Sequence, residues 1–249
     1  MQTVLSSSFL RRGRIVRSAS RILVASERVL LPCRDGIRLT ADVSKHAAPA
    51  PLAILIHGWL GDSVSSYLLS TAGHLFDQGY TVARLHLRDH GGSEHLNEEM
   101  FHSARIEEVV DACNWLARVY GQGRAALIGY SLGGNFALRA TGHPALTATL
   151  AATIAICPVI QPGPTMHAID SGWFAYRHYF VRKWHRALAA KQRAFPRVFA
   201  LDAFKIARDE ASDPDLQLRM QGIAFQGAFF AASPVMQQAG LDEARLLTA

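Results

Sequence analysis

The sequence predicts an α/β fold with a mainly parallel sheet flanked by helices, and three observations support this. Short apolar runs alternate with segments of helical spacing from residue 27 to residue 160. Most of these apolar runs are continuous, which fits strands that are buried on both faces. The composition fits a packed domain, since 49% of the 249 residues are hydrophobic and 18% are charged. In such a fold the binding crevice lies at the carboxyl ends of the strands.

The expected elements follow in order along the chain. Two alternating runs flank the turn dipeptide Asp35-Gly36 and predict a hairpin over 27–43. Further strands are expected at 51–57, 80–87, 125–130 and 150–159, with helices at 65–79, 104–121 and 134–143. One side of the helix 104–121 is apolar and carries Ile106, Val109, Val110, Cys113 and Leu116.

After Val159 the pattern changes to a helical segment, 167–196, that is dense in aromatic and basic residues. It predicts a helical insertion, or lid, over the sheet. Its aromatic side chains either line an apolar substrate channel or pack the insertion onto the core; they are Trp173, Tyr176, Tyr179, Phe180 and Trp184. We therefore expect four parts: a basic N-terminal arm (1–26), the α/β core (27–160), a helical cap-like insertion (161–205) and an atypical C-terminal tail (206–249).

The formal net charge of +6 is partly local, because five arginines precede the first acidic residue, Glu27: Arg11, Arg12, Arg14, Arg17 and Arg21. This segment is either a solvated arm packed along the domain or a mitochondrial transit peptide. Together with the aromatic and basic helix 173–193 it is also compatible with peripheral contact to an anionic membrane. Nucleic-acid binding is not expected, because the arginines are not interleaved with aromatic residues and no nucleic-acid motif occurs.

The three cysteines, Cys33, Cys113 and Cys157, are far apart and predict neither a disulfide framework nor a zinc site. The early apolar stretch is interrupted by arginines and does not form a secretory signal. These features favour a reducing, cytoplasmic location.

One stretch carries a catalytic motif: residues 129–135, GYSLGGN, place a serine between two glycines. The pattern G-x-S-x-G between a strand and a helix is that of a nucleophile elbow, in which Ser131 sits on a sharp turn above the sheet. Gly129 and Gly133 are then needed because the strand and helix backbones approach closely. Ser131 is accordingly our candidate nucleophile.

A serine that attacks a carbonyl also needs donors for the developing oxyanion. The backbone N–H of Leu132, next to the serine, is the first candidate, and that of Trp59, after the strand 51–57, is the second. His57 precedes the serine in the chain, which favours a structural role. The turn 88–95 is expected near the site; a metal site built from Asp89, His90, Glu94 and His95 is the alternative, although its spacing matches no metal pattern.

These motifs together resemble the α/β-hydrolase superfamily, and more narrowly its YheT-like branch of predicted esterases. The resemblance rests on HGWLGDSVSSY (57–67), RDHGGS (88–93), HSARIEEVVDACNWL (102–116), GYSLGGN (129–135) and the cap-like segment 176–196. It implies Ser131 as the nucleophile, carboxylic esters of small molecules or lipids as substrates, and no cofactor.

The resemblance also implies a later catalytic Asp and His, and here the sequence departs from the family. The last histidine, His185, lies inside the cap-like helix, and Asp170 with His178 or His185 cannot be assigned as the pair. Two hypotheses follow: a serine ester hydrolase, or a catalytically impaired or dead fold that acts as a binding protein. We expect a truncated or frame-shifted chain lacking about the last third of a domain of about 300 residues. Its sheet would lack the last strands, and the open edge would permit oligomerisation.

Overall fold

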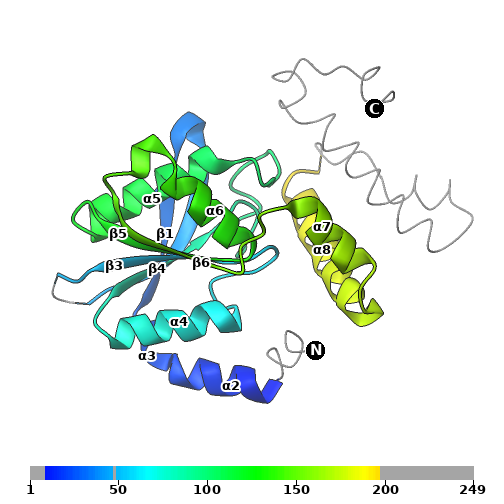
Figure 1. Ribbon diagram of the computed structural model, residues 1–249, viewed down its shortest axis with the longest axis horizontal. Coiled ribbons are helices and arrows are strands. Elements are labelled where there is room, and N and C mark those ends of the chain that lie inside the picture. Colours follow the sequence, from blue (N-terminus) through cyan, green and yellow to red (C-terminus); the bar gives the residue numbers. More distant parts are fainter. Residues whose placement is uncertain (1–8, 47–48, 197–249) are drawn as a thin grey trace, which may run out of the picture. The chain divides into compact units, whose positions relative to one another are not determined.

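The computed structural model describes residues 9–46 and 49–196, and the predicted tail 206–249 lies outside these ranges. At the centre is a six-stranded sheet in the order β1-β2-β4-β3-β5-β6 (Figure 1). The strands are β1 (Ser26–Pro32), β2 (Arg38–Ser44), β3 (Leu52–Ile56), β4 (Thr81–His86), β5 (Ala125–Tyr130) and β6 (Leu150–Ile156). β2 runs antiparallel to β1 and β4, and the other neighbours are parallel. The predicted α/β class with a mainly parallel sheet is confirmed.

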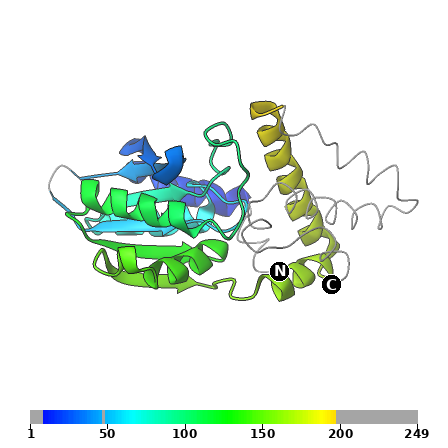
Figure 2. The same cartoon turned by 90° about the horizontal axis from the view of Figure 1, so that it is seen from above.

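Helices cover both faces of this sheet. Figures 1 and 2 show α5 (Ile106–Tyr120) and α6 (Leu132–Thr141) on one face and α4 (Ser66–Asp77) on the other. Strands β3 and β4 are fully buried. The continuous apolar sequence of β3 predicts this, whereas β4 also buries Arg84 and His86. On α5, the predicted apolar side is buried, with Val109, Val110, Cys113 and Leu116 inaccessible to solvent.

The N-terminal segment forms two helices that the sequence did not predict, α2 (Phe9–Ser18) and α3 (Ser20–Val24). They pack against α4, where Ala19 approaches Gly73 closely. Ile22 is buried, and its carbonyl oxygen accepts a hydrogen bond of 2.9 Å from the Ser44 hydroxyl. Residues 19–25 are therefore part of the folded domain.

Three other elements differ in detail from the sequence prediction. The hairpin turn contains a short 3-10 helix (Arg34–Gly36), and both Asp35 and Gly36 have positive φ, as such a turn requires. A second 3-10 helix spans Pro144–Leu146. The helix expected over 167–196 is two helices, α7 (Pro162–Asp170) and α8 (Phe174–Ala194).

Strand β6 lies at one edge of the sheet and, within the described residues, pairs only with β5. Its residues are partly exposed, including Ile154 and Ile156. In the part of the chain that the structure covers, no helix has the length and apolar character needed to cross a membrane.

Candidate functional site

Ser131 occupies a strained turn between β5 and α6. Its φ of 53° and ψ of −115° match the first central position of a type II′ turn, which glycine normally fills. A side chain in this region costs about 1–3 kcal/mol, and the conformation persists only where the surroundings enforce it. The strained residue lies at the carboxyl end of β5 and directly before α6, which is where a nucleophile elbow would place its serine.

The flanking glycines permit this turn. A Cβ at Gly129 would overlap the carbonyl oxygen of Gly133. One at Gly133 would overlap the main chain at the end of β3, 2.5 Å from the carbonyl oxygen of Ile56. Strand and helix therefore meet at backbone contact on both sides of Ser131.

Hydrogen bonds fix the elbow to the end of β6. The Ser131 N–H donates to the carbonyl of Ile156 at 2.9 Å. The Ser131 carbonyl accepts from the N–H groups of Asn135 and Val159, at 3.1 and 3.2 Å. The Asn135 side chain closes the ring by donating to the Val159 carbonyl at 2.8 Å. These bonds hold the strained residue without using its hydroxyl.

The loop 57–61, called the oxyanion loop below, lies beside the serine. A Cβ built on Gly58 would be 3.3 Å from the Cβ of Ser131. The Gly58 N–H donates to the Tyr67 hydroxyl at 3.0 Å, and the Gly61 N–H donates to the Gly58 carbonyl at 2.9 Å. No acceptor for the Trp59 N–H is found among the described residues.

The N–H of Leu132, like that of Trp59, lacks a described acceptor. It occupies the first position of α6, where a helix provides no internal acceptor, and no acceptor is found in the described ranges. Both N–H groups named from the sequence therefore lack an acceptor within residues 9–46 and 49–196, and they lie on the two segments that flank Ser131.

Three buried histidines form a cluster at the oxyanion loop: His57, which is the first residue of the loop, His86 and His90. The ring of His57 lies 4.8 Å from that of His90 and 6.2 Å from that of His86. Each Nε2 accepts a backbone N–H, from Leu87 to His57, Ser63 to His86 and Leu60 to His90. Each Nδ1 therefore carries the proton, and it donates to an oxygen of Gly58, Thr40 and Arg88 respectively.

Burial lowers the pKa of all three histidines, to about 4 for His86 and well below the usual value for His57. They are therefore neutral at pH 7. With both ring nitrogens of His57 engaged inside the fold, this histidine is structural and is not a base for Ser131.

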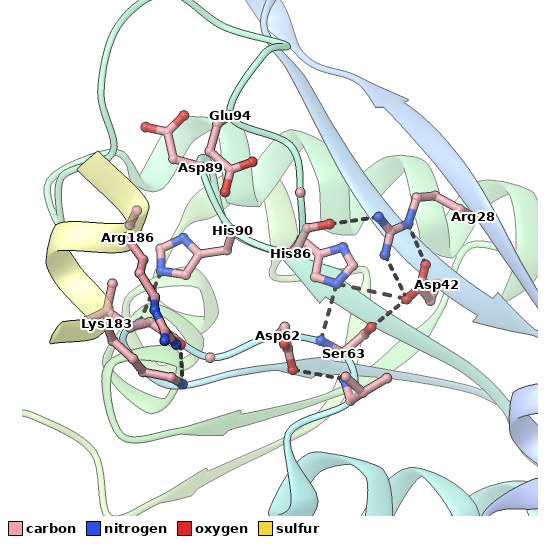
Figure 3. A pocket seen from close by; sticks show the side chains of 16 residues that line it. Arg28, Asp42, Asp62, Ser63, His86, Asp89, His90, Glu94, Lys183 and Arg186 are labelled. Atoms are coloured by element: carbon pink, nitrogen blue, oxygen red, sulfur yellow. Dashed lines mark hydrogen bonds and ion pairs between the residues drawn. The ribbon is translucent and has the colours of Figure 1, made fainter. Parts of the chain in front are cut away.

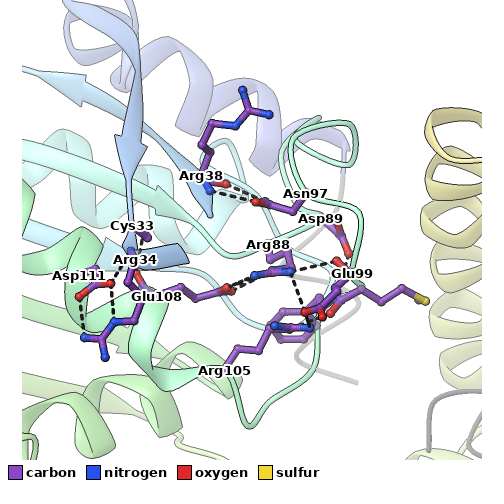
Figure 4. Close-up of polar contacts among 12 residues, drawn as sticks. Cys33, Arg34, Arg38, Arg88, Asp89, Asn97, Glu99, Arg105, Glu108 and Asp111 are labelled. Atoms are coloured by element: carbon purple, nitrogen blue, oxygen red, sulfur yellow. Dashed lines mark hydrogen bonds and ion pairs between the residues drawn. The ribbon is translucent and has the colours of Figure 1, made fainter. Parts of the chain in front are cut away.

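The turn 88–95 follows β4 and contacts α8 through Lys191. Arg88 forms a buried ion pair with Glu108 (Figure 4). Asp89 accepts from Lys191 at 2.8 Å and from the N–H of Phe101 at 2.8 Å. Positive φ angles at Asp89, Gly91 and Gly92 make this turn tight. No group of three metal-ligating side chains occurs in the described part of the chain, and Asp89 and His90 are engaged elsewhere.

A polar pocket of about 450 Å³ opens between the oxyanion loop, this turn and α8 (Figure 3). Lys183 and Arg186 project into it from α8, and Arg28 and Asp42 form an ion pair at its wall. Ser131 does not line it. The pocket is therefore separate from the candidate nucleophile and contains side chains of both charges.

Comparison with protein families assigns the fold. The model of the α/β hydrolase fold family matches residues 51–201, which is more than half of the chain. The chain belongs to the α/β-hydrolase fold family. The match includes both segments that meet at the strained serine and the whole of α8.

Curated relatives place this hydrolase-fold chain near the YheT-like esterases. It is 26% identical over 173 residues to YheT of Escherichia coli, whose name gives esterase as a provisional assignment. It is 30% identical over 172 residues to a Haemophilus influenzae protein provisionally named esterase/lipase. These alignments cover 68% and 69% of this chain but 51% and 52% of the relatives. The chain thus spans about half the length of the curated relatives it matches.

The esterase Pf2001 of Pyrococcus furiosus shares the fold, with a TM-score of 0.52 at 19% identity. The match covers 64% of this α/β-hydrolase chain and 60% of that esterase. At this level of identity the likeness concerns the fold alone.

The aromatic residues expected in the helical segment 167–196 of this α/β-hydrolase chain divide into two groups. Phe180 and Trp184 contact Trp59 of the oxyanion loop, with ring centroids 5.7 and 6.4 Å apart, and so pack α8 onto the core. Trp173 and Tyr179 are exposed by 57% and 49%. The side chain of Tyr176 lies outside what the structure describes.

The structure also contains site residues that the sequence prediction missed. The Tyr67 hydroxyl holds Gly58, Lys183 donates to the Leu60 carbonyl at 2.9 Å, and Lys191 is buried against Asp89. No local sequence pattern marks these residues. The two lysines, for example, lie in a basic helix, where a lysine is expected to be exposed to solvent. His178 and His185, both exposed on α8, have no described contact with Ser131, and the Asp170 side chain is not described.

Proposed function

We propose that this chain is a serine hydrolase of carboxylic esters, of a small molecule or a lipid, and that it acts through an acyl-enzyme on Ser131. The observation that carries the proposal is the strained backbone of Ser131, which close glycines and main-chain hydrogen bonds enforce, while no described residue bonds its hydroxyl. The esterase names of the curated relatives support the same reaction class. No cofactor enters this chemistry.

In the proposed reaction, the Ser131 Oγ attacks the ester carbonyl carbon, and the carbonyl oxygen becomes an oxyanion. The N–H groups of Trp59 and Leu132 donate to that oxyanion; one such donor contributes about 3–4 kcal/mol to the transition state. The C–O bond to the alcohol then breaks, the alcohol takes the serine proton, and water hydrolyses the acyl ester.

The proton transfer requires a base that the described residues do not provide. His57 is excluded by its two internal hydrogen bonds, and no described histidine contacts the Ser131 hydroxyl. Without a base, serine is a weak nucleophile at neutral pH. This favours, as the second candidate, a catalytically impaired fold that binds an ester or another apolar ligand without turning it over.

One experiment separates the two candidates. The wild type and Ser131→Ala are incubated with a fluorophosphonate probe and with p-nitrophenyl butyrate. The hydrolase predicts labelling and ester turnover that both disappear in the variant. Folded wild type that is not labelled, and whose turnover equals that of Ser131→Ala, would leave only the binding protein.

Three expectations from the sequence stay predictions. They are a cytoplasmic location, association of copies through the edge strand β6, and contact of the basic, aromatic helix α8 with an anionic membrane. The third is checked by cosedimentation with anionic vesicles, which should fall as salt rises.

A further inference from the structure

The cap helix α8 contacts the oxyanion loop at two neighbouring residues. The ammonium group of Lys183 donates to the Leu60 carbonyl at 2.9 Å (Figure 3). One residue earlier, the indole of Trp59 stacks on Phe180, with ring planes 10° apart, and also meets Trp184. The element that carries these groups lies more than 120 positions later in the sequence.

The loop these contacts hold is an unfavourable turn. The bond from the Gly61 N–H to the Gly58 carbonyl makes residues 58–61 a β-turn, with Trp59 and Leu60 as its central residues. Leu60 has a φ of 56° at the third position, as in a type II turn, where glycine is preferred. A leucine there favours a different turn unless outside groups fix its backbone.

Two outside groups do so. His90 accepts the Leu60 N–H at Nε2, and Lys183 donates to the Leu60 carbonyl. The first contact comes from the turn after β4, and the second comes from α8. The Trp59 N–H belongs to the same turn, so its direction depends on both contacts.

We propose that Lys183 is a positioning residue that holds the turn 58–61 in its strained form and so aims the Trp59 N–H at the oxyanion. The same contact that packs α8 on the loop then also completes the oxyanion site. This inference rests on the proposed esterase function. In this role Lys183 acts through the Leu60 carbonyl, to which its ammonium group donates.

The test compares Lys183→Met, which keeps the aliphatic stem but removes the donor, with Lys183→Arg, which retains a cationic donor. Arg182→Met, on the exposed side of the same helix, is the matched control. A misplaced catalytic group costs up to about 100-fold in rate. Lys183→Met should therefore lower kcat and the rate of fluorophosphonate labelling by about 10- to 100-fold, with KM within about threefold. Lys183→Arg should recover most of the rate, and Arg182→Met should behave as wild type.

Amide hydrogen exchange gives a readout that does not depend on activity. Lys183→Met should speed exchange at the Leu60 and Gly61 amides while the urea midpoint stays unchanged. Wild-type kcat in Lys183→Met, or a loss that arginine does not recover, would overturn the inference. If the wild type shows no labelling that depends on Ser131, the proposed function fails, and the role of Lys183 in catalysis fails with it. If amide exchange is unchanged in Lys183→Met, Lys183 does not hold the turn either.

Discussion

The guanidinium of Arg88 meets the carboxylate of Glu108 at 2.5 Å, and the two side chains are exposed by only 1% and 3% (Figure 4). Arg88 follows β4, and Glu108 lies in the first turn of α5, where a negative charge is also favoured by the helix dipole. Burial raises the pKa of Glu108, against the opposing effect of Arg88.

Removal of one partner of this pair should be costly. Arg88→Met leaves a buried carboxylate unpaired and should reduce the free energy of unfolding by about 3–5 kcal/mol. Replacing both, in Arg88→Met with Glu108→Leu, should restore much of the loss. The exposed pair of Arg34 and Asp111 is the control, and Arg34→Ala should cost about 1 kcal/mol or less in urea unfolding. Equal losses at the two sites would contradict the expectation.

The histidine cluster predicts acid sensitivity. For His86 the folded pKa, about 4, is below the unfolded value of about 6.5, so the unfolded chain takes up the proton first as pH falls. The stabilisation from this group is complete above pH 6.5 and is lost between pH 6.5 and 4, by up to about 3 kcal/mol. Urea unfolding at a series of pH values measures the slope. Replacing His86 by Gln should flatten it, whereas replacing the exposed His95 by Gln should leave it unchanged.

The elbow glycines predict a sharp contrast along α6. Gly133→Ala puts a Cβ into the main chain of β3 and should destabilise the fold by about 1–3 kcal/mol or more. Labelling of Ser131 should be lost as well, because the turn must shift. Gly142, at the other end of the helix, has its nearest neighbour 3.7 Å from the added Cβ. Gly142→Ala should therefore leave both stability and labelling intact, and an effect equal to that of Gly133→Ala would count against the packing account.

The N-terminal helices offer a test of docking. Ile22 is 1% exposed and Val24 is 88% exposed, two positions apart in α3. Ile22→Ala should cost about 2–4 kcal/mol of unfolding free energy, and Val24→Ala should cost little. If thermal and urea unfolding do not distinguish the two variants, α3 is not docked in solution.

The sequence predicted most of the sheet, since each of its strands is a local pattern of apolar residues. The ends of elements were harder to predict. Helix α6 begins at Leu132, two residues before the expected start. The glycines there discourage a helix in the sequence, but they are needed for the close contact with β3 and β5. The helices before residue 25 were missed, because their charge indicated an arm and their stability comes from packing of Ala19 and Ile22 on distant residues.

The candidate site divides in the same way. Motifs were enough to name Ser131, Leu132 and Trp59 as candidates, because an elbow and the loop after a strand have local signatures. The contacts around them involve Tyr67, Lys183 and three histidines, of which one follows β3, one ends β4 and one lies in the turn after β4. Such pairings depend on tertiary folding, and in a single sequence nothing links a lysine of α8 to the backbone of the oxyanion loop.

At position 131 the proposed reaction requires a serine, whereas the stability of the backbone favours a glycine. Glycine would accept its φ of 53° and ψ of −115° without strain, and the serine hydroxyl contributes no described hydrogen bond to the fold. A laboratory selection for heat resistance alone, with no demand for turnover, should therefore replace this serine by glycine. Thermal selection and esterase screening would thus drive the same codon in opposite directions, and a library sorted for robust folding would be depleted of active members.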